Sequence, residues 1–144
     1  MDLILKNAPI PMEYGPKRIR ILLAEGTCDG ISFWIFSYGT HPCAYVEVTD
    51  FKDLETDDID CHGGITYDEG ALPSVWDDTC DGFEQGKRRF IGWDYAHCYD
   101  FIMCASFAVS GYRWTTDEIL QHVEDVVSQI REITANGKKT NKEG

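Results

Sequence analysis

Apolar and polar residues alternate over several short stretches of the chain, which is the pattern of β-strands with one buried face. We expect strands at 18–26, 31–39, 43–49, 60–67 and 88–97. Asp29-Gly30 separates the first two stretches, and an Asp-Gly pair favours a tight hairpin turn. The alternation therefore predicts an antiparallel β-sheet of about five strands.

A different pattern near the C-terminus predicts one long amphipathic helix, because apolar residues recur there at spacings of three and four. The stripe consists of Ile119, Val123, Val126, Ile130 and Ile133. Thr115 and Glu118 form a capping-box pair at its start. Asn136-Gly137 is expected to end the helix.

Strands followed by one helix favour an α+β fold, with the helix packed on one face of the sheet. We expect a single domain over 1–136, with an irregular lead-in at 1–16 and a flexible tail at 137–144. Residues 68–86 form a polar insertion, and 98–113 is either a buried loop or a short helix. Since 31–36 is apolar on both sides, the second face of the sheet is expected to meet a partner subunit or the segment 98–112.

The composition narrows the class of protein. The 144 residues carry a formal charge of −12, which argues against a general nucleic-acid binder because such proteins present a basic face. Six acidic residues lie in 50–60 and four in 77–84. We interpret both runs as solvated loops. Neither has the glycine-centred spacing of an EF-hand calcium loop, and DNA mimicry is a weaker option.

The six cysteines include no Cys-x-x-Cys pair, so the common zinc and thioredoxin spacings are missing. The N-terminal apolar run is too short for a signal peptide, and no stretch approaches the length of a membrane span. We therefore expect a cytoplasmic protein with mostly free, buried thiols and no membrane contact.

Two histidines stand in short motifs beside aspartates: HGGIT at 62–66 and WDYAHCYD at 93–100. A pair of histidines can supply a general base and a general acid, because imidazole titrates near neutral pH. Aspartates orient the rings and stabilise the charged form. We expect the catalytic group to be His62, His97, Asp94, Asp100 and Thr66. Asp94, His97 and Asp100 converge if the strand ends near Tyr95 and the chain turns.

The same side chains would also suit zinc or manganese, although we expect catalysis without a metal or other cofactor.

A lone histidine is more often a structural residue than a catalytic one. His41 is interpreted as a turn residue that could reach the same end of the sheet. His122 lies one position from the helix stripe and is expected on the surface.

The remaining candidates are basic and aromatic residues that could bind a ligand. Arginine makes two parallel hydrogen bonds to phosphate, and aromatic rings stack on bases, although both kinds more often have structural roles. The expected ligand contacts are Gly63, Gly64, Tyr67, Trp93, Tyr99, Arg88 and Arg89. Lys17, Arg18 and Arg20 form a second basic group.

The double glycine after His62 has two interpretations. A bare backbone lets a phosphate approach the N–H groups of Gly63 and Gly64. Alternatively, the glycines form a β-bulge that curls the sheet under the helix. The sequence does not separate the two.

These motifs resemble those of a small phage-borne family. Its members carry a His-Gly-Gly-(Leu/Ile)-Thr-(Tyr/Phe) motif, a Gly-Phe-Asp-Cys-Ala-His-x-Gly-Asp motif and a helix opened by Trp-Thr. The resemblance covers about 31–134 and selects His62, Gly63, Gly64, Thr66, Asp94, His97 and Asp100. Tyr95 stands where the family has Cys, and Tyr99 where it has Gly.

The phage resemblance implies a counter-defence protein in an infected bacterium that acts on a nucleotide immune signal, either a cyclic dinucleotide or an ADP-ribose derivative. One hypothesis is a phosphodiesterase that cleaves the signal with its histidines. A second is a homo-oligomeric sponge that binds the signal unchanged. A third is an acidic inhibitor of a host defence enzyme.

Overall fold

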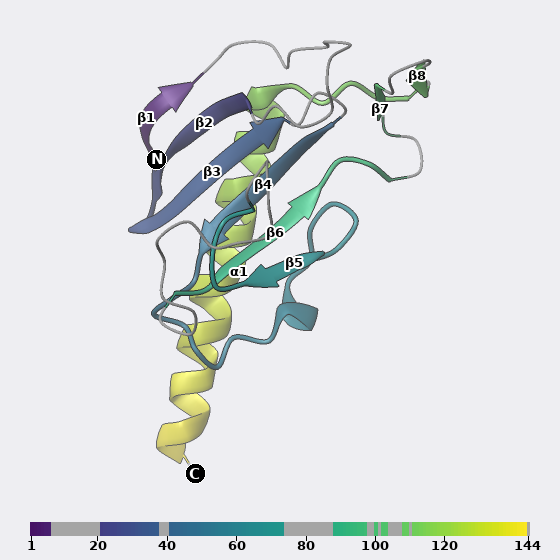
Figure 1. Ribbon diagram of the computed structural model, residues 1–144. Helices are drawn as coiled ribbons and strands as arrows, with labels where there is room; N and C mark the ends of the chain where they lie inside the picture. Colours follow the sequence, from purple (N-terminus) through teal and green to yellow (C-terminus); the bar gives the residue numbers. More distant parts are fainter. Residues whose placement is uncertain are drawn as a thin grey trace.

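The computed structural model describes residues 1–6, 21–37, 41–73, 88–97, 100, 102–103, 108–109 and 111–143. Six strands in these ranges form one antiparallel sheet in the order β1-β2-β3-β4-β6-β5. A single long helix, α1 (Thr116–Glu143), crosses one face of it (Figure 1). The α+β prediction is confirmed, with six strands where about five were expected.

Four predicted stretches, 18–26, 31–39, 43–49 and 88–97, each correspond to a strand whose ends lie within a few residues of the predicted ones. The observed bounds are β1 Asp2–Lys6, β2 Ile21–Cys28, β3 Ile31–Ser37, β4 Pro42–Glu47, β5 Tyr67–Glu69 and β6 Phe90–Asp94. The lead-in 1–16 was expected to be irregular, but its first part is the strand β1, which pairs antiparallel with β2. Residues 7–20 lie outside the described part, including Lys17, Arg18 and Arg20.

The turn between β2 and β3 has the predicted form. Cys28 pairs with Ile31 across it. Asp29 and Gly30 both have positive φ, 49° and 80°. Such dihedrals match the right-handed twist of the two strands, and Asp and Gly tolerate them better than other residues.

The hydrophobic core lies between the sheet and α1. Ile119, Val123, Val126 and Ile130 are fully buried, so the predicted helix stripe is confirmed. They pack against the side chains that point to the same face of the sheet: Leu23, Phe33, Ile35, Ala44, Val46, Ile91 and Trp93. This contact fixes α1 across the middle strands.

The opposite face of the sheet is aromatic and also buried. Tyr45 meets Phe36 and Tyr67 with ring centroids 5.9 and 5.2 Å apart, and Trp34 meets Phe90 at 5.6 Å. Phe36, Tyr45 and Phe90 are each at most 5% exposed. Edge-to-face contacts of this kind stabilise an aromatic cluster beyond the burial of area alone.

The start of α1 has the predicted capping box. The Glu118 amide donates to Thr115 Oγ1 at 3.2 Å, and the Thr115 amide donates to Glu118 Oε1 at 3.0 Å. The helix does not end at Asn136-Gly137 but continues to Glu143. A glycine inside a helix costs only about 1 kcal/mol relative to alanine, and extending an existing helix is far easier than starting one.

Two other predicted segments differ from the structure. Residues 60–67 are not a strand: a turn occupies 62–63, and β5 begins only at Tyr67. The described parts of 98–113 contain two short paired strands, β7 (Ile102–Met103) and β8 (Ala108–Val109), rather than a helix. Most of the polar insertion, 74–87, lies outside the described residues.

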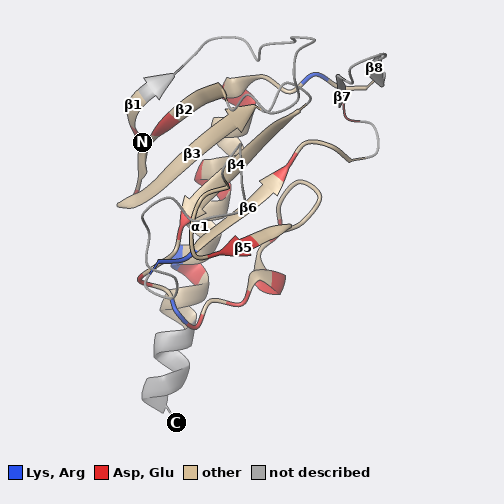
Figure 2. Cartoon of the chain, viewed as in Figure 1, with Lys and Arg blue, Asp and Glu red and all other residues tan. Residues whose placement is uncertain are grey.

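The acidic segment 50–60 is largely a solvated loop, as expected. Leu54 and Ile59 are buried and anchor it, while the acidic residues are exposed and include those of the 3-10 turn η1 (Thr56–Asp58). Figure 2 shows acidic residues on η1 and on β5. The run at 77–84 is outside the described part. In the described part of the chain, no helix combines the length and apolar character that a membrane crossing requires.

Candidate functional site

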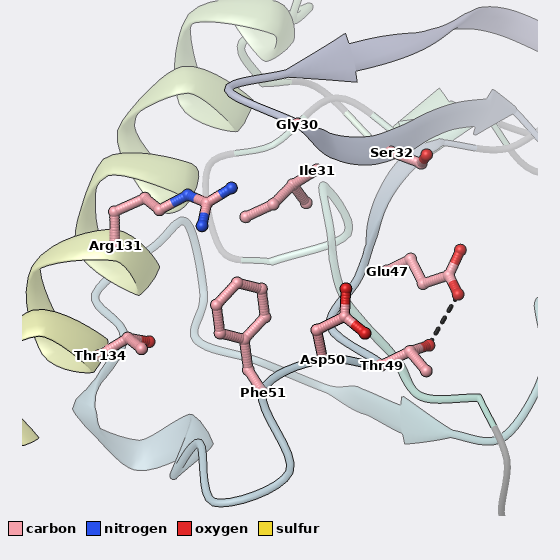
Figure 3. A pocket seen from close by; sticks show the side chains of 9 residues that line it. All are labelled: Gly30, Ile31, Ser32, Glu47, Thr49, Asp50, Phe51, Arg131 and Thr134. Atoms are coloured by element: carbon pink, nitrogen blue, oxygen red, sulfur yellow. Dashed lines mark hydrogen bonds between the residues drawn. The ribbon is translucent and has the colours of Figure 1, made fainter. Parts of the chain in front are cut away.

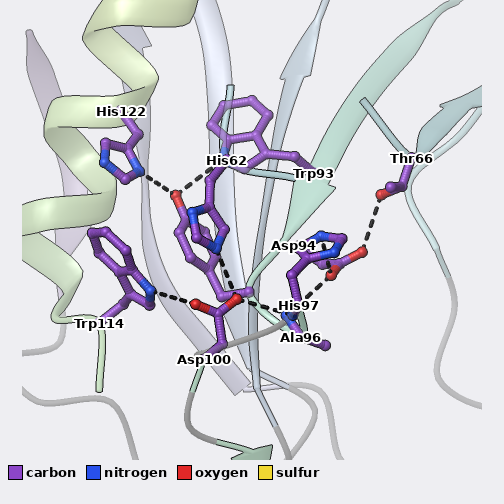
Figure 4. Close-up of polar contacts among 10 residues, drawn as sticks. His62, Thr66, Trp93, Asp94, Ala96, His97, Asp100, Trp114 and His122 are labelled. Atoms are coloured by element: carbon purple, nitrogen blue, oxygen red, sulfur yellow. Dashed lines mark hydrogen bonds and ion pairs between the residues drawn. The ribbon is translucent and has the colours of Figure 1, made fainter. Parts of the chain in front are cut away.

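All four histidines of the chain are found at one end of the sheet, where β4 begins, β6 ends and α1 starts: Figure 4 shows His62, His97 and His122, and His41 stands next to Pro42, the first residue of β4. His41 immediately precedes β4, and its pKa is lowered chiefly by burial and also responds to Asp94 and His97. The ring centroid of His62 is 5.7 Å from that of His97 and 6.3 Å from that of His122. The expectation that His41 is near this end is supported, and His122, expected on the surface, is partly exposed and packs against Tyr95.

His62 is held by a buried carboxylate, Asp100 (Figure 4). Its Nε2 lies 2.7 Å from Asp100 Oδ2, and the Trp114 indole donates to Asp100 Oδ1 at 2.8 Å. The His97 amide donates to Oδ2 at 3.0 Å. Burial alone would raise the pKa of Asp100, but these hydrogen bonds together lower it. Asp100 therefore remains a carboxylate that fixes the orientation of the His62 ring.

His97 is paired with Asp94 at the exposed side of the cluster. Its Nε2 lies 3.1 Å from Asp94 Oδ1, at an angle that is not that of a hydrogen bond and with the nitrogen shielded from solvent. Thr66 Oγ1 donates to Asp94 Oδ2 at 3.1 Å. The Asp100 amide donates to the His97 carbonyl at 3.0 Å, which keeps Asp100 close to His97. The convergence expected beyond Tyr95 therefore occurs.

Tyr95 connects the histidine cluster to the helix. Trp93 Nε1 donates to the Tyr95 hydroxyl at 2.9 Å, and that hydroxyl lies 2.7 Å from His122 Nδ1. An indole N–H can only donate, so the Tyr95 hydroxyl accepts from Trp93 and shares a further hydrogen bond with His122 Nδ1. The Tyr95 ring also stacks on His62, with centroids 4.8 Å apart and planes 13° apart.

Burial sets the protonation of the Tyr95–His122 pair. Tyr95 is fully buried, and burial raises the pKa of its hydroxyl. Burial and then the nearby His62 lower the pKa of His122. Both shifts favour the neutral forms of Tyr95 and His122.

The double glycine serves the packing of His97. Gly63 and Gly64 have φ of 70° and 81°, and a Cβ on Gly63 would stand 2.1 Å from His97 Nε2. The Gly64 amide donates to the Cys61 carbonyl at 3.0 Å, so that N–H is already used within the turn. The bare backbone thus admits an imidazole, a role that neither sequence interpretation included.

Arg88 and Arg89 do not belong to this cluster. They precede β6 while Asp94 ends it, so a five-residue strand of about 15 Å separates the two ends. Arg88 makes two hydrogen bonds to Glu47 at 2.9 and 3.1 Å, and Arg89 makes two to Asp68 at 2.8 and 2.9 Å. Their expected role as phosphate ligands beside the histidines is wrong for this reason.

The aromatic candidates are also placed elsewhere than expected. Trp93 is 1% exposed and belongs to the core, so its ring offers no face to a ligand. Tyr67 lies with Tyr45 on the aromatic face, and its hydroxyl donates to the Ala71 carbonyl. Tyr99 and Trp76 lie outside the described residues.

Among the described residues, no group of three or more His, Cys, Asp or Glu side chains has the arrangement of a metal site. Cys28, Cys43 and Cys61 are free thiols. Burial raises the pKa of Cys43 to about 12 and that of Cys61 to about 11. Neither thiol is a nucleophile at neutral pH, because the thiolate is the reactive form.

The structure thus assembles a cluster in which Asp100 orients His62 through a hydrogen bond and Asp94 lies 3.1 Å from His97. Its central members are His62, His97, Asp94, Asp100 and Thr66, the five residues expected to act together. Sequence reasoning missed Trp114, Tyr95 and His122 as partners. The only signal for His122 was its spacing of three from Ile119, which places both on nearly the same side of the helix.

Comparison of the chain with protein-family models, with curated proteins and with solved structures found no match.

Proposed function

We propose that the protein is a phosphodiesterase that uses His62 and His97 as its general base and general acid. The observation that carries this proposal is the pair of histidine–aspartate contacts, with the two imidazole centroids 5.7 Å apart. Both rings remain partly accessible, with 22% and 33% of the side chains exposed. A substrate can therefore reach them without unfolding the cluster.

The proposed reaction uses one histidine on each side of the phosphorus. One neutral imidazole removes the proton from the attacking hydroxyl, either of water or of a ribose. A new oxygen–phosphorus bond then forms while the bridging oxygen–phosphorus bond breaks. The other imidazole, protonated at the start, gives its proton to the leaving oxygen.

The aspartates act through the histidines rather than on the substrate. With Nε2 of His62 bound to Asp100, Nδ1 is the nitrogen left for proton transfer. Asp100 is 2% exposed and is fixed by Trp114, so it holds the His62 ring in place. Asp94 lies beside His97, with its Oδ1 3.1 Å from Nε2, and is the carboxylate partner proposed for that ring.

The substrate proposed is a nucleotide immune signal, a cyclic dinucleotide or an ADP-ribose derivative, and the role proposed is phage counter-defence. Support for this part comes from the resemblance of the HGGIT and WDYAHCYD motifs to the phage-borne family. The acidic charge of −12 favours a small ligand over a polynucleotide, because it repels an extended phosphate backbone.

The test is incubation of the purified protein with cyclic dinucleotides and with cyclic and linear ADP-ribose, followed by chromatography before and after heating. New products that disappear in His62→Asn and His97→Asn, with a loss of about 100-fold or more each, support the proposal. Circular dichroism of the variants separates lost chemistry from lost folding. Full turnover in both variants would overturn it.

Two other outcomes of the same experiment identify the alternative functions. A ligand that disappears and is recovered unchanged after heating establishes a sponge. No loss of any ligand favours a protein partner, in which case charge reversal across the exposed acidic segment 50–60 should abolish the activity.

A further inference from the structure

A pocket lies at the end of the sheet opposite the histidines. It has a volume of about 480 Å³ and is lined by the β2–β3 turn, the end of β4 with the loop after it, and one side of α1. The residues that line it are Gly30, Ile31, Ser32, Glu47, Thr49, Asp50, Phe51, Arg131 and Thr134. A volume of this size holds a small molecule.

One wall of the pocket is a fixed cation, Arg131. Its Nε lies 3.3 Å from Asp29 Oδ2, its Nη2 donates to the Asp29 carbonyl, and its guanidinium lies over the Phe51 ring at 5.4 Å from the centroid. A Cβ on Gly30 would be 3.3 Å from Nη2, so the glycine leaves room for the guanidinium. These contacts use Nε and Nη2, and within the described ranges Nη1 is left for a ligand.

The opposite wall is anionic and is formed by Glu47 and Asp50. Glu47 is oriented by two hydrogen bonds from Arg88 and one of 2.7 Å from Thr49. No ion pair joins Asp50 to another residue in the described ranges. Figure 3 shows both carboxylates across the pocket from the guanidinium, with Ile31 and Phe51 between the two walls.

The walls select a ligand that carries both charges. A phosphate-rich molecule would meet two carboxylates, and a polyamine would meet a guanidinium; like charges at close range repel in each case. A zwitterion satisfies both walls, with its ammonium group beside Asp50 and Glu47 and its carboxylate on Arg131. The hydroxyl of Ser32 is a further acceptor for an ammonium group.

We propose that this pocket binds a small zwitterion that carries an ammonium group and a carboxylate, an amino acid or a close analogue. The carboxylate would accept a hydrogen bond from Arg131 Nη1, and the short apolar stretch between the charges would lie over Ile31 and Phe51. This site is separate from the histidine cluster, so its ligand is not the proposed substrate.

The test is a titration of the full chain, followed by amide NMR signals, with glycine, γ-aminobutyrate and ε-aminocaproate. These zwitterions separate their charges by increasing distances. Butylamine and butyrate, which carry one charge each, are the controls. We expect at least one zwitterion to shift the signals of Gly30, Ser32 and Asp50 at millimolar concentration, while the single-charge controls do not.

The variants make the assignment specific. Asp50→Asn and Arg131→Gln should each weaken zwitterion binding by about tenfold, while Asp53→Asn, an exposed acid of the same loop, should not. Asp50→Asn is the decisive variant, because Arg131→Gln also loses the Asp29 contact. No shift with any zwitterion, equal shifts with butylamine or butyrate, or unchanged binding in Asp50→Asn would overturn the proposal.

Discussion

The imidazole of His97 lies directly on the backbone of Gly63, at the point where a Cβ would stand 2.1 Å from Nε2. These residues are far apart in the chain, and the contact holds the His62 turn against the end of β6. It places the two histidines of the proposed chemistry beside each other. The glycine is therefore required by a side chain of the same protein.

Replacement of Gly63 tests this contact against a matched neighbour. Gly63→Ala and Gly64→Ala both place alanine at positive φ, at a cost of about 1–2 kcal/mol each. Only Gly63→Ala also clashes with His97, because a Cβ on Gly64 meets nothing within 4 Å. We expect Gly63→Ala to lower the free energy of unfolding more and to shift the His97 ring signals. Equal effects in urea unfolding would contradict the contact.

Replacement of Asp100 is expected to lower the stability of the fold more than replacement of Asp94. Asp100→Asn loses the charge that accepts from His62, Trp114 and the His97 amide, and we expect a loss of about 1–3 kcal/mol in stability. Asp94→Asn should cost less, because the Asp94 side chain is 26% exposed and that of Asp100 only 3%. Chemical unfolding of both variants measures the difference, and a larger loss for Asp94→Asn would be the wrong order.

His122 gives the stability a defined pH dependence. Burial and His62 lower the pKa of His122 in the folded state, whereas in the unfolded chain His122 has its ordinary pKa of 6.5. As the pH falls below 6.5, the unfolded state binds the proton first. The free energy of unfolding should therefore decrease until the pH passes the folded-state pKa.

His41 contributes in the same direction, since burial also lowers its pKa. Asp100 contributes in a separate range: its stabilisation is present above its ordinary pKa of 3.8 and is lost as the pH falls through the lower folded-state pKa. Urea unfolding between neutral pH and about pH 5 isolates the histidines. His122→Asn should reduce the slope there, and an unchanged slope would remove His122 as a cause.

Arg88 and Arg89 are expected to be dispensable for the proposed phosphodiesterase. Arg88→Met and Arg89→Met each remove a partly exposed ion pair, with Glu47 or Asp68, at the far end of β6. We expect unchanged turnover and a stability loss of about 1 kcal/mol or less. Loss of turnover in a folded variant, measured with the substrate that the wild type cleaves, would place the substrate closer to these residues.

The sequence determined the local elements, because these depend on residues close in the chain. The spacing of Ile119, Val123 and Val126 predicted the buried stripe of α1, and Thr115 with Glu118 predicted its cap. Asp29-Gly30 predicted the hairpin. The helix end and the strand at 60–67 were predicted wrongly, since local signals such as Asn136-Gly137 are weak and tertiary context overrides them.

Only the tertiary structure decided which residues meet. His62 and Asp100 are 38 positions apart, and they touch because the turn before β5 and the end of β6 are brought together by strand pairing. The same pairing places Arg88 and Arg89 at the far end of the sheet. His122 joins the cluster because the core stripe of α1 fixes how the helix is rotated over Tyr95. Long-range strand order and helix rotation follow from packing of the whole chain, which no local pattern contains.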